Sequence, residues 1–193
     1  MQKKEINQIV ESLLFASPEP LTQTQLNSIF EADMVDPELI NLEIIINDLQ
    51  ETYDKNDNAF TIAKVAGGFQ IVSRAEYAVF IRRLLKKSGR LMLTNASLET
   101  LSIVAYRQPV NRFEIESIRG VDSSGVLKTL LAKNLIKIKG RDSGPGRPLL
   151  YNTTDKYLEY FGLSNLSEMP KLSELTELEK SDSPEVNQTD AFE

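Results

Sequence analysis

Hydrophobic residues along the chain follow the helical period of three to four residues in some segments and alternate with polar residues in others. Three helical segments come first and two strand-like segments follow them: 4–16, 22–30, 36–53, 60–65 and 69–72. The run Ser17-Pro18-Glu19-Pro20 separates the first two helices, because proline cannot continue a helix. Thr22 suits the N-cap of the second helix, and Asp36-Pro37 suits the start of the third. The pair Gly67-Gly68 marks a hairpin turn between the strands.

The same order of elements recurs in the second half of the chain, after a basic amphipathic helix over 77–87. Helices, two strands and a closing helix are expected at 95–107, 112–119, 124–131, 135–139, 149–153 and 155–161. Thr94 or Asn95 suits the N-cap of the first of these helices. Asn111 suits the N-cap of the second, and Asp122 or Ser123 that of the third.

Three helices followed by strand, loop and strand is the order of a winged helix-turn-helix domain. The order occurs twice, and each copy is closed by an additional helix. The sequence therefore predicts a mainly α-helical α+β fold with small β-hairpins, built from two tandem winged helix-turn-helix domains. Their boundaries are expected at 1–87 and 92–163, with a linker over 88–94 and an acidic, mostly disordered tail over 164–193.

Two residue types that carry much of enzyme chemistry are missing from the 193 residues, since the chain has no cysteine and no histidine. A thiolate nucleophile, a disulfide framework and the commonest general base and metal ligand are therefore excluded. No apolar run approaches the ~18 residues of a membrane span, and no signal-peptide core follows Met1. We expect a soluble cytoplasmic protein without catalytic residues, cofactor, metal or small-molecule ligand.

A glycine-rich loop over 140–148 is the only segment with the look of a phosphate cradle. A nucleotide-binding loop needs a Gly-Lys-Ser/Thr run that opens a helix, so that backbone N–H groups meet the phosphates. Here the loop opens a strand, and Pro145 and Pro148 lack the N–H group. The turn of a wing is the better interpretation.

Charge is divided sharply between the two halves of the chain. Residues 1–80 carry five Lys/Arg and thirteen Asp/Glu, whereas residues 81–150 carry fourteen and five, within a total net charge of −6. Between residues 5 and 54 there is no lysine or arginine, and eleven carboxylates are present. Because phosphate contacts supply most of the affinity for DNA, the first domain is excluded as a DNA reader. The opposite charges suggest different partners, although two solvated domains of unrelated charge are the simpler alternative.

A second copy of the chain is the simplest partner for the first domain. One face of a helix over 36–53 would enter the core, namely Leu39, Leu42, Ile46, Leu49 and Tyr53. Ile40 and Ile44 would fall on the opposite face and be exposed. Two stacked apolar side chains on one helix suggest a protein contact, so we predict a homodimer whose interface includes Ile40 and Ile44.

The second domain is basic, yet its third helix suits base reading poorly. That helix begins Ser123-Ser124-Gly125, and Lys128 is the only long donor in its first two turns. Base edges in the major groove are normally read by Arg, Lys, Asn or Gln. We expect at most a weak and non-specific contact with DNA, and an acidic protein surface is the other candidate ligand.

Several segments of the chain, taken together, indicate a protein family more specifically than any one of them does. They are Leu98-Glu99-Thr100-Leu101-Ser102-Ile103-Val104-Ala105-Tyr106-Arg107-Gln108-Pro109-Val110, Gly125-Val126-Leu127-Lys128-Thr129-Leu130-Leu131, Tyr151-Asn152-Thr153-Thr154 and Ala66-Gly67-Gly68-Phe69-Gln70. This set resembles the bacterial segregation and condensation protein B family. The resemblance covers about residues 1–165.

The resemblance implies a homodimer formed chiefly through the first domain. It also implies a non-enzymatic accessory subunit of the bacterial condensin-type SMC complex, acting in chromosome condensation and partition before cell division and associated with the nucleoid. The dimer would bind the kleisin subunit, segregation and condensation protein A, whose ends bridge the SMC ATPase heads. For the kleisin-binding surface we predict residues that flank the helix 112–119 and are not needed for its core: Tyr106, Arg107, Arg112 and Arg119.

A winged-helix transcriptional regulator is the main alternative to a complex subunit. A regulator should bind duplex DNA specifically and with a steep dependence on salt. The accessory subunit should bind DNA weakly on its own and co-purify with a kleisin. A hydrolase is a third alternative, and it would have to activate water without histidine, cysteine or a metal cluster.

Overall fold

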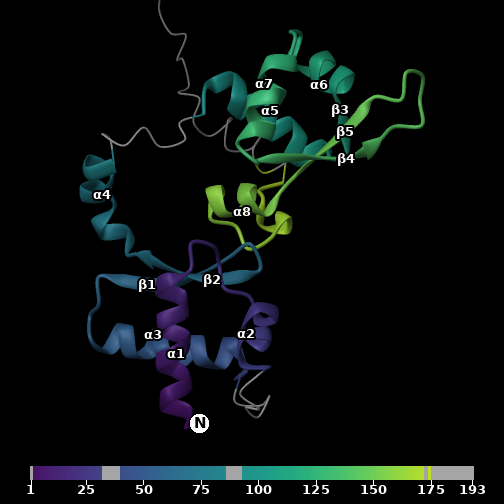
Figure 1. The fold of residues 1–193 in the computed structure, drawn as a ribbon. Coiled ribbons are helices and arrows are strands. Elements are labelled where there is room, and N and C mark those ends of the chain that lie inside the picture. The colour runs from purple at the N-terminus through teal and green to yellow at the C-terminus, as the bar shows by residue number, and fades with distance from the viewer. Residues whose placement is uncertain (1, 32–39, 86–92, 172–173, 175–193) are drawn as a thin grey trace, which may run out of the picture.

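The structure is a computed structural model that describes residues 2–31, 40–85, 93–171 and 174 (Figure 1). Its buried apolar side chains form two separate clusters, one in the first half of the chain and one in the second. The first cluster is enclosed by three helices and a two-stranded sheet, and the second by four helices and a three-stranded sheet. The prediction of a mainly helical α+β fold with two tandem winged helix-turn-helix domains is confirmed.

The first domain packs three helices against a two-stranded hairpin. Its elements are α1 (Lys3–Ala16), α2 (Gln23–Phe30), α3 (Leu42–Lys55), β1 (Phe60–Val65) and β2 (Gly68–Ser73). Thr22 is the N-cap of α2, as predicted, and forms a capping box with Gln25. Ile62, Phe69 and Ile71 pack from the hairpin onto the helical core, so the sheet closes the core on one side.

Helix α3 begins later than the sequence predicts. Asn41 is its N-cap, with an extended backbone and a side-chain oxygen that accepts a first-turn N–H at 3.1 Å. The carbonyl of Ile40 accepts from Gln23 Nε2 at 2.8 Å, and the N–H of Leu42 donates to Gln23 Oε1 at 2.8 Å. Gln23 therefore ties the chain ahead of α3 to helix α2. The predicted start at Asp36-Pro37 lies outside the described residues.

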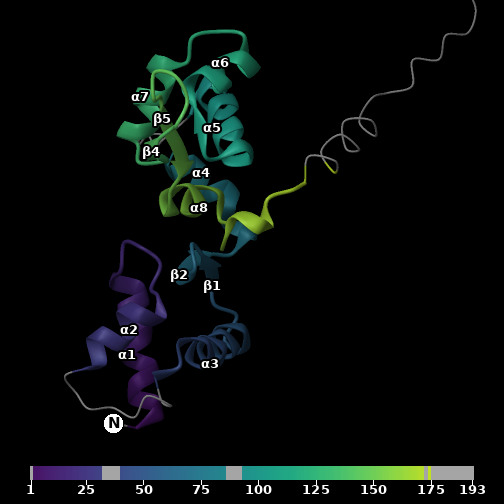
Figure 2. The same cartoon turned by 90° about the vertical axis from the view of Figure 1, so that its right-hand side faces the viewer.

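After β2 the chain forms a short 3₁₀ turn, η3 (Ala75–Tyr77), and then helix α4 (Ala78–Leu85). The two views in Figures 1 and 2 place α4 beyond the hairpin and away from helices α1 to α3. The additional helix that closes the first copy is thus present, but it does not join the first hydrophobic core.

The second domain repeats the order, with one short strand added between its first two helices. Its elements are α5 (Asn95–Arg107), β3 (Val110–Asn111), α6 (Arg112–Arg119), α7 (Ser124–Ala132), β4 (Ile136–Arg141), β5 (Leu149–Thr153), α8 (Asp155–Phe161) and the 3₁₀ turn η4 (Leu166–Glu168). The strands are ordered β3-β5-β4 and pair antiparallel. Asn111 caps α6, as the sequence predicts, and of the two candidates Thr94 and Asn95 it is Thr94 that caps α5.

The segment that follows α8 lies between the two domains in both views (Figures 1 and 2). The N–H of Ala66, at the hairpin turn, donates to the carbonyl of Leu163 at 2.8 Å. The hydroxyl of Ser164 donates to the carbonyl of Lys64 at 2.9 Å. Residues 164–171, which the sequence analysis assigned to the disordered tail, are therefore folded and contact both domains; Met169, for example, packs on the second core.

Gly68 allows the loop before α2 to approach the hairpin closely. Leu21 and Phe69 exchange two backbone hydrogen bonds, of 2.8 and 2.9 Å. A Cβ atom on Gly68 would lie 2.8 Å from the carbonyl oxygen of Leu21 and 3.1 Å from the carbonyl carbon of Pro20. Because these are backbone atoms, they cannot rotate away as a side chain would.

We expect Gly68→Ala to lower the free energy of unfolding of the first domain by about 1–3 kcal/mol, the usual cost of overpacking. Gly125→Ala is the matched control, since Gly125 lies in α7 with open space around its added Cβ. Alanine there should leave stability unchanged or raise it by up to about 1 kcal/mol through helix propensity. Scanning calorimetry measures both, and equal transition temperatures for the two variants would contradict the close approach.

Candidate partner-binding surfaces

An open groove of about 750 Å³ lies on the second domain between helix α6 and the loop that joins β4 to β5. We call this loop, residues 142–148, the wing, and the hollow the α6–wing groove. It is lined by Arg107, Val110, Asn111, Phe113, Glu114, Ser117, Ile118, Asp142, Gly144, Pro145 and Pro148. Loop 140–148 is therefore a wing turn that leads into β5, as predicted, and it opens no helix.

Asp142 holds the wing against the start of α6. Its carboxylate accepts from Asn111 Nδ2 at 3.3 Å, and its backbone N–H donates to the Pro148 carbonyl at 2.8 Å. Asn111 in turn caps α6 through a capping box with Glu114. One pair of side chains thus joins the two walls of the groove.

The α6 wall of this groove is apolar with cations beside it. Phe113 is 62% exposed and Ile118 is 55% exposed, so two large side chains of α6 face solvent. The Arg112 guanidinium lies 5.5 Å from the centre of the Phe113 ring, a cation–π distance. Such a wall suits an apolar side chain of a partner that also carries carboxylates.

The four residues predicted for partner binding do not form one surface. Arg107 is exposed and lines the α6–wing groove, and Arg112 lies beside it on α6. Tyr106 instead donates its hydroxyl to the carbonyl of Pro170 at 2.8 Å, so it binds the segment after α8. Arg119 is enclosed by its own domain, and its side chain is only 6% exposed. A role of any of the four in partner binding stays a prediction.

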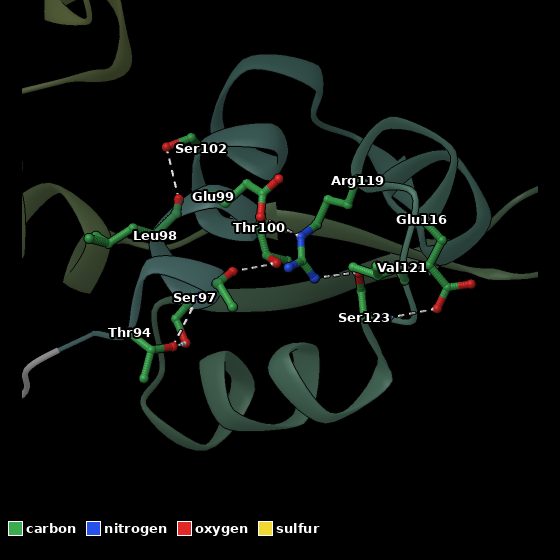
Figure 3. A network of polar contacts seen from close by, with 11 residues as sticks. Thr94, Ser97, Leu98, Glu99, Thr100, Ser102, Glu116, Arg119, Val121 and Ser123 are labelled. Atoms are coloured by element: carbon green, nitrogen blue, oxygen red, sulfur yellow. Dashed lines mark hydrogen bonds and ion pairs between the residues drawn. The ribbon is translucent and has the colours of Figure 1, made fainter.

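Arg119 connects three helices of the second domain (Figure 3). Its Nε lies 3.0 Å from Glu99 Oε2 on α5, and its Nη1 donates to the Ser123 hydroxyl at 2.9 Å. Ser123 is fully buried ahead of α7, and its N–H donates to Glu116 Oε1 at 3.0 Å. The prediction that Arg119 is not needed for the core is therefore wrong, because its charge is used inside the domain.

A carboxylate lies at the start of α7, the helix that would enter a DNA groove. The hydroxyl of Ser124 donates to Asp122 at 2.6 and 2.8 Å, and this bond is the main cause that lowers the pKa of the Asp122 carboxyl. An ionised carboxylate favours the N-terminal end of a helix but repels a phosphate. This position therefore weakens the approach of α7 to DNA.

In the first domain the two isoleucines predicted for the dimer interface lie in different environments. Ile44 is 52% exposed on α3, as predicted. Ile40 is 6% exposed and belongs to the first core, so the prediction that it is exposed is wrong. The reason is the late start of α3, because Ile40 precedes the helix and the assumed helical face does not extend to it. The dimer contact at Ile44 stays a prediction.

Exposed Phe113 is a groove residue that the sequence analysis did not assign to a binding surface. The sequence does indicate that Phe113 is exposed. Phe113 and the buried Ile115 are two positions apart on α6, so their side chains point about 200° apart around the helix. Asp142 could not be found this way, because its partner Asn111 is distant in sequence and only folding brings them together.

Within the residues that the structure describes, no group of three His, Cys, Asp or Glu side chains is placed to hold a metal ion. No helix in the described ranges is long and apolar enough to cross a membrane.

We expect Arg119→Ala to lower the free energy of unfolding of the second domain by about 1.5–3 kcal/mol, the range for hydrogen bonds to a charged group. Arg112→Ala is the matched control on the same helix. Arg112 pairs with Glu116 at 3.3 Å but is 43% exposed, so its loss should cost about 0–1 kcal/mol. Urea unfolding followed by circular dichroism compares them, and a larger loss for Arg112→Ala would contradict the assignment.

Comparisons with known proteins agree with the sequence resemblance. The model of the family described as "Segregation and condensation complex subunit ScpB" matches residues 8–172. The segregation and condensation protein B of Syntrophotalea carbinolica is 42% identical over 180 residues, which cover 93% of this chain and 88% of that protein. The protein of the same name from Listeria monocytogenes serovar 1/2a is 39% identical over 194 residues, which cover 100% of this chain and 93% of that protein.

Two solved structures are also similar. ScpB from Mycobacterium tuberculosis is 29% identical with a TM-score of 0.38, and the match covers 84% of this chain and 98% of that one. A dimer of an ScpB N-terminal domain complexed with an ScpA peptide is 26% identical with a TM-score of 0.35, over 42% of this chain and 95% of that one. The family match and the identity to full-length relatives together show that the chain belongs to the segregation and condensation protein B family.

Proposed function

We propose that the chain acts as a non-enzymatic accessory subunit of the bacterial SMC complex, in chromosome condensation and partition. Family membership supports this role, because the family is that of a subunit of the segregation and condensation complex. A homodimer formed through the first domain binds the kleisin subunit, segregation and condensation protein A, and through it the SMC ATPase. The composition supports the non-enzymatic part, since the chain has neither histidine nor cysteine.

The α6–wing groove is the observation that best supports kleisin binding by the second domain. Phe113 and Ile118 offer apolar surface, and Arg107 and Arg112 place two cations beside it. An amphipathic kleisin segment would bury its apolar side chains against Phe113 and Ile118. Its carboxylates would pair with Arg107 and Arg112. Specificity would then come from the spacing of apolar and acidic residues in the partner.

A sequence-specific transcriptional regulator is less well supported. The exposed face of α7 carries Gly125, Lys128 and Thr129, of which only the lysine is a long donor. Asp122 adds a negative charge at the start of this helix. We infer that contact with DNA is weak or indirect and is made through the complex.

Charge reversal of Arg107 and Arg112 together should weaken kleisin binding about tenfold or more, because each exposed pair contributes up to about 1 kcal/mol. Isothermal titration calorimetry with the purified kleisin measures the change. Lys128→Glu is the matched control, since it alters the exposed charge of the same domain on α7 and should leave the affinity unchanged. Equal affinities for all three proteins would rule out the α6–wing groove as the kleisin site.

The purified chain should bind duplex DNA without sequence preference, and only at low salt, because phosphate contacts alone are available to it. Fluorescence anisotropy over a salt series measures this binding, with unrelated duplexes as competitors. Tight binding of one particular operator that persists at physiological salt would favour the transcriptional regulator instead.

A further inference from the structure

Helix α4 carries an apolar face that the described part of its own chain leaves open. Tyr77, Phe80, Ile81 and Leu84 recur at helical spacing along one side of the helix and the turn before it. Phe80 is 66% exposed and Leu84 is 76% exposed. Within the described residues α4 packs chiefly on η3, the turn that precedes it. Two large side chains on one short helix are more than the scattered exposed apolar residue that is normal on a surface.

Arg74 fixes the direction in which α4 leaves the domain. Its Nε donates to the carbonyl of Asn58 at 2.7 Å, and its Nη2 lies 2.6 Å from Asp54 Oδ1 at the end of α3. Its backbone N–H donates to the carbonyl of Ala59 at 3.1 Å. Three bonds to the chain around β1 therefore anchor the residue just before η3, and α4 projects beyond the hairpin (Figures 1 and 2).

The body of the same domain carries an apolar groove of about 530 Å³. It lies between the end of α1, the end of α3 and the hairpin, and we call it the α1–hairpin groove. It is lined by Glu11, Ser12, Phe15, Tyr53, Ala59, Phe60, Ile71, Val72 and Ser73. Phe15 is 84% exposed, the largest value among the exposed large apolar side chains of the described residues. Tyr53 meets Phe60 edge to face with ring centres 5.0 Å apart, so the floor is aromatic.

The charges of the two surfaces are opposite. Arg82 and Arg83 make α4 basic, and the Arg83 guanidinium lies 5.8 Å from the centre of the Phe80 ring at the edge of the apolar face. Glu11 lies in the α1–hairpin groove, where its carboxylate accepts the Tyr53 hydroxyl at 2.8 Å, and the segment 5–54 that forms most of the body has no lysine or arginine. A basic amphipathic helix and an acidic, apolar groove on the same domain are complementary to each other.

We propose that α4 of one copy of the chain docks in the α1–hairpin groove of a second copy, and that the contact is reciprocal. The proposal rests on the proposed homodimer of the first domain. It places the dimer interface at α4 and the α1–hairpin groove instead of at the single exposed residue Ile44. Docking of α4 in the groove of its own chain is disfavoured. Residues 71–73 line the groove, and Arg74, which follows them directly, is anchored so that the chain leaves the domain there and α4 points away from the groove. Two identical contacts related by a two-fold axis close the dimer and leave no free end for further growth.

Light scattering of the full chain tests the proposal with Phe80→Glu combined with Leu84→Glu. Both side chains are exposed, so the charged residues should not disturb either core. The unmodified chain is expected to have twice the mass of one chain, and the double variant the mass of one. Ile29→Glu, at an exposed position on α2 of the same domain, is the matched control and should remain a dimer. Ile44→Glu is a third variant that tests the contact predicted from the sequence.

The possible results separate the two proposals. If the double variant is still a dimer, the α4 contact is overturned but the proposed homodimer is not. If the Ile44→Glu variant is then a monomer, the interface lies at α3 instead. A monomeric unmodified chain overturns both. Circular dichroism that shows equal helix content in all variants ensures that a loss of mass reflects a lost contact.

Cross-linking tells docking between copies from docking within one chain, and the absence of native cysteine makes it clean. Chains with Leu84→Cys are mixed with chains that carry Phe15→Cys and treated with a flexible bismaleimide. We expect covalent dimers well above the yield of either chain alone. A chain with both cysteines that closes only an internal link, with no mixed dimer formed, would overturn the reciprocal contact.

Discussion

Each domain of this chain must close its hydrophobic core with three or four helices and a sheet of only two or three strands. A body of this size buries only about 60–70% of the surface of its unfolded chain, so part of its apolar surface has no cover. Part of this remainder lies on Phe15, Phe80 and Leu84 in the first domain and on Phe113 and Ile118 in the second. Both proposed contacts use this remainder, because its burial is the main free energy that a small domain can offer a partner.

Charged residues divide into those that hold the domains together and those that are available to partners. Arg74 and Arg119 are basic residues that the fold itself uses, one to anchor the exit of α4 and one to join α5, α6 and the start of α7. Arg107 and Arg112 are more exposed and lie at the α6–wing groove. Arginines of equal formal charge therefore differ in their availability to a partner. A cation that is enclosed by its hydrogen-bonding partners cannot exchange them for a ligand without a large cost in free energy.

The segment after α8 connects the two domains through one backbone bond and one bond from a side-chain hydroxyl. Bonds from Ala66 to Leu163 and from Ser164 to Lys64 link the tip of the first hairpin to the end of the second domain. The bond from Ala66 to Leu163 joins two backbone groups, so many substitutions of side chains would leave it intact, whereas the second bond needs the hydroxyl of Ser164. The hairpin therefore contacts the second domain with its tip and borders the α1–hairpin groove with its other end.

The sequence by itself determined the order of the helices and strands, most of the caps, the twofold repeat and the absence of histidine and cysteine chemistry. These depend on local periodicity and on single-residue conformational preferences, as for Thr22, Asn111 and the wing loop. Only the tertiary structure decided that Ile40 is buried, that Arg119 is enclosed, that Tyr106 binds the segment after α8 and that α4 stays outside the first core. The first three depend on groups distant in sequence, Gln23 for Ile40, Glu99 for Arg119 and Pro170 for Tyr106, and no periodic pattern specifies which of them will meet.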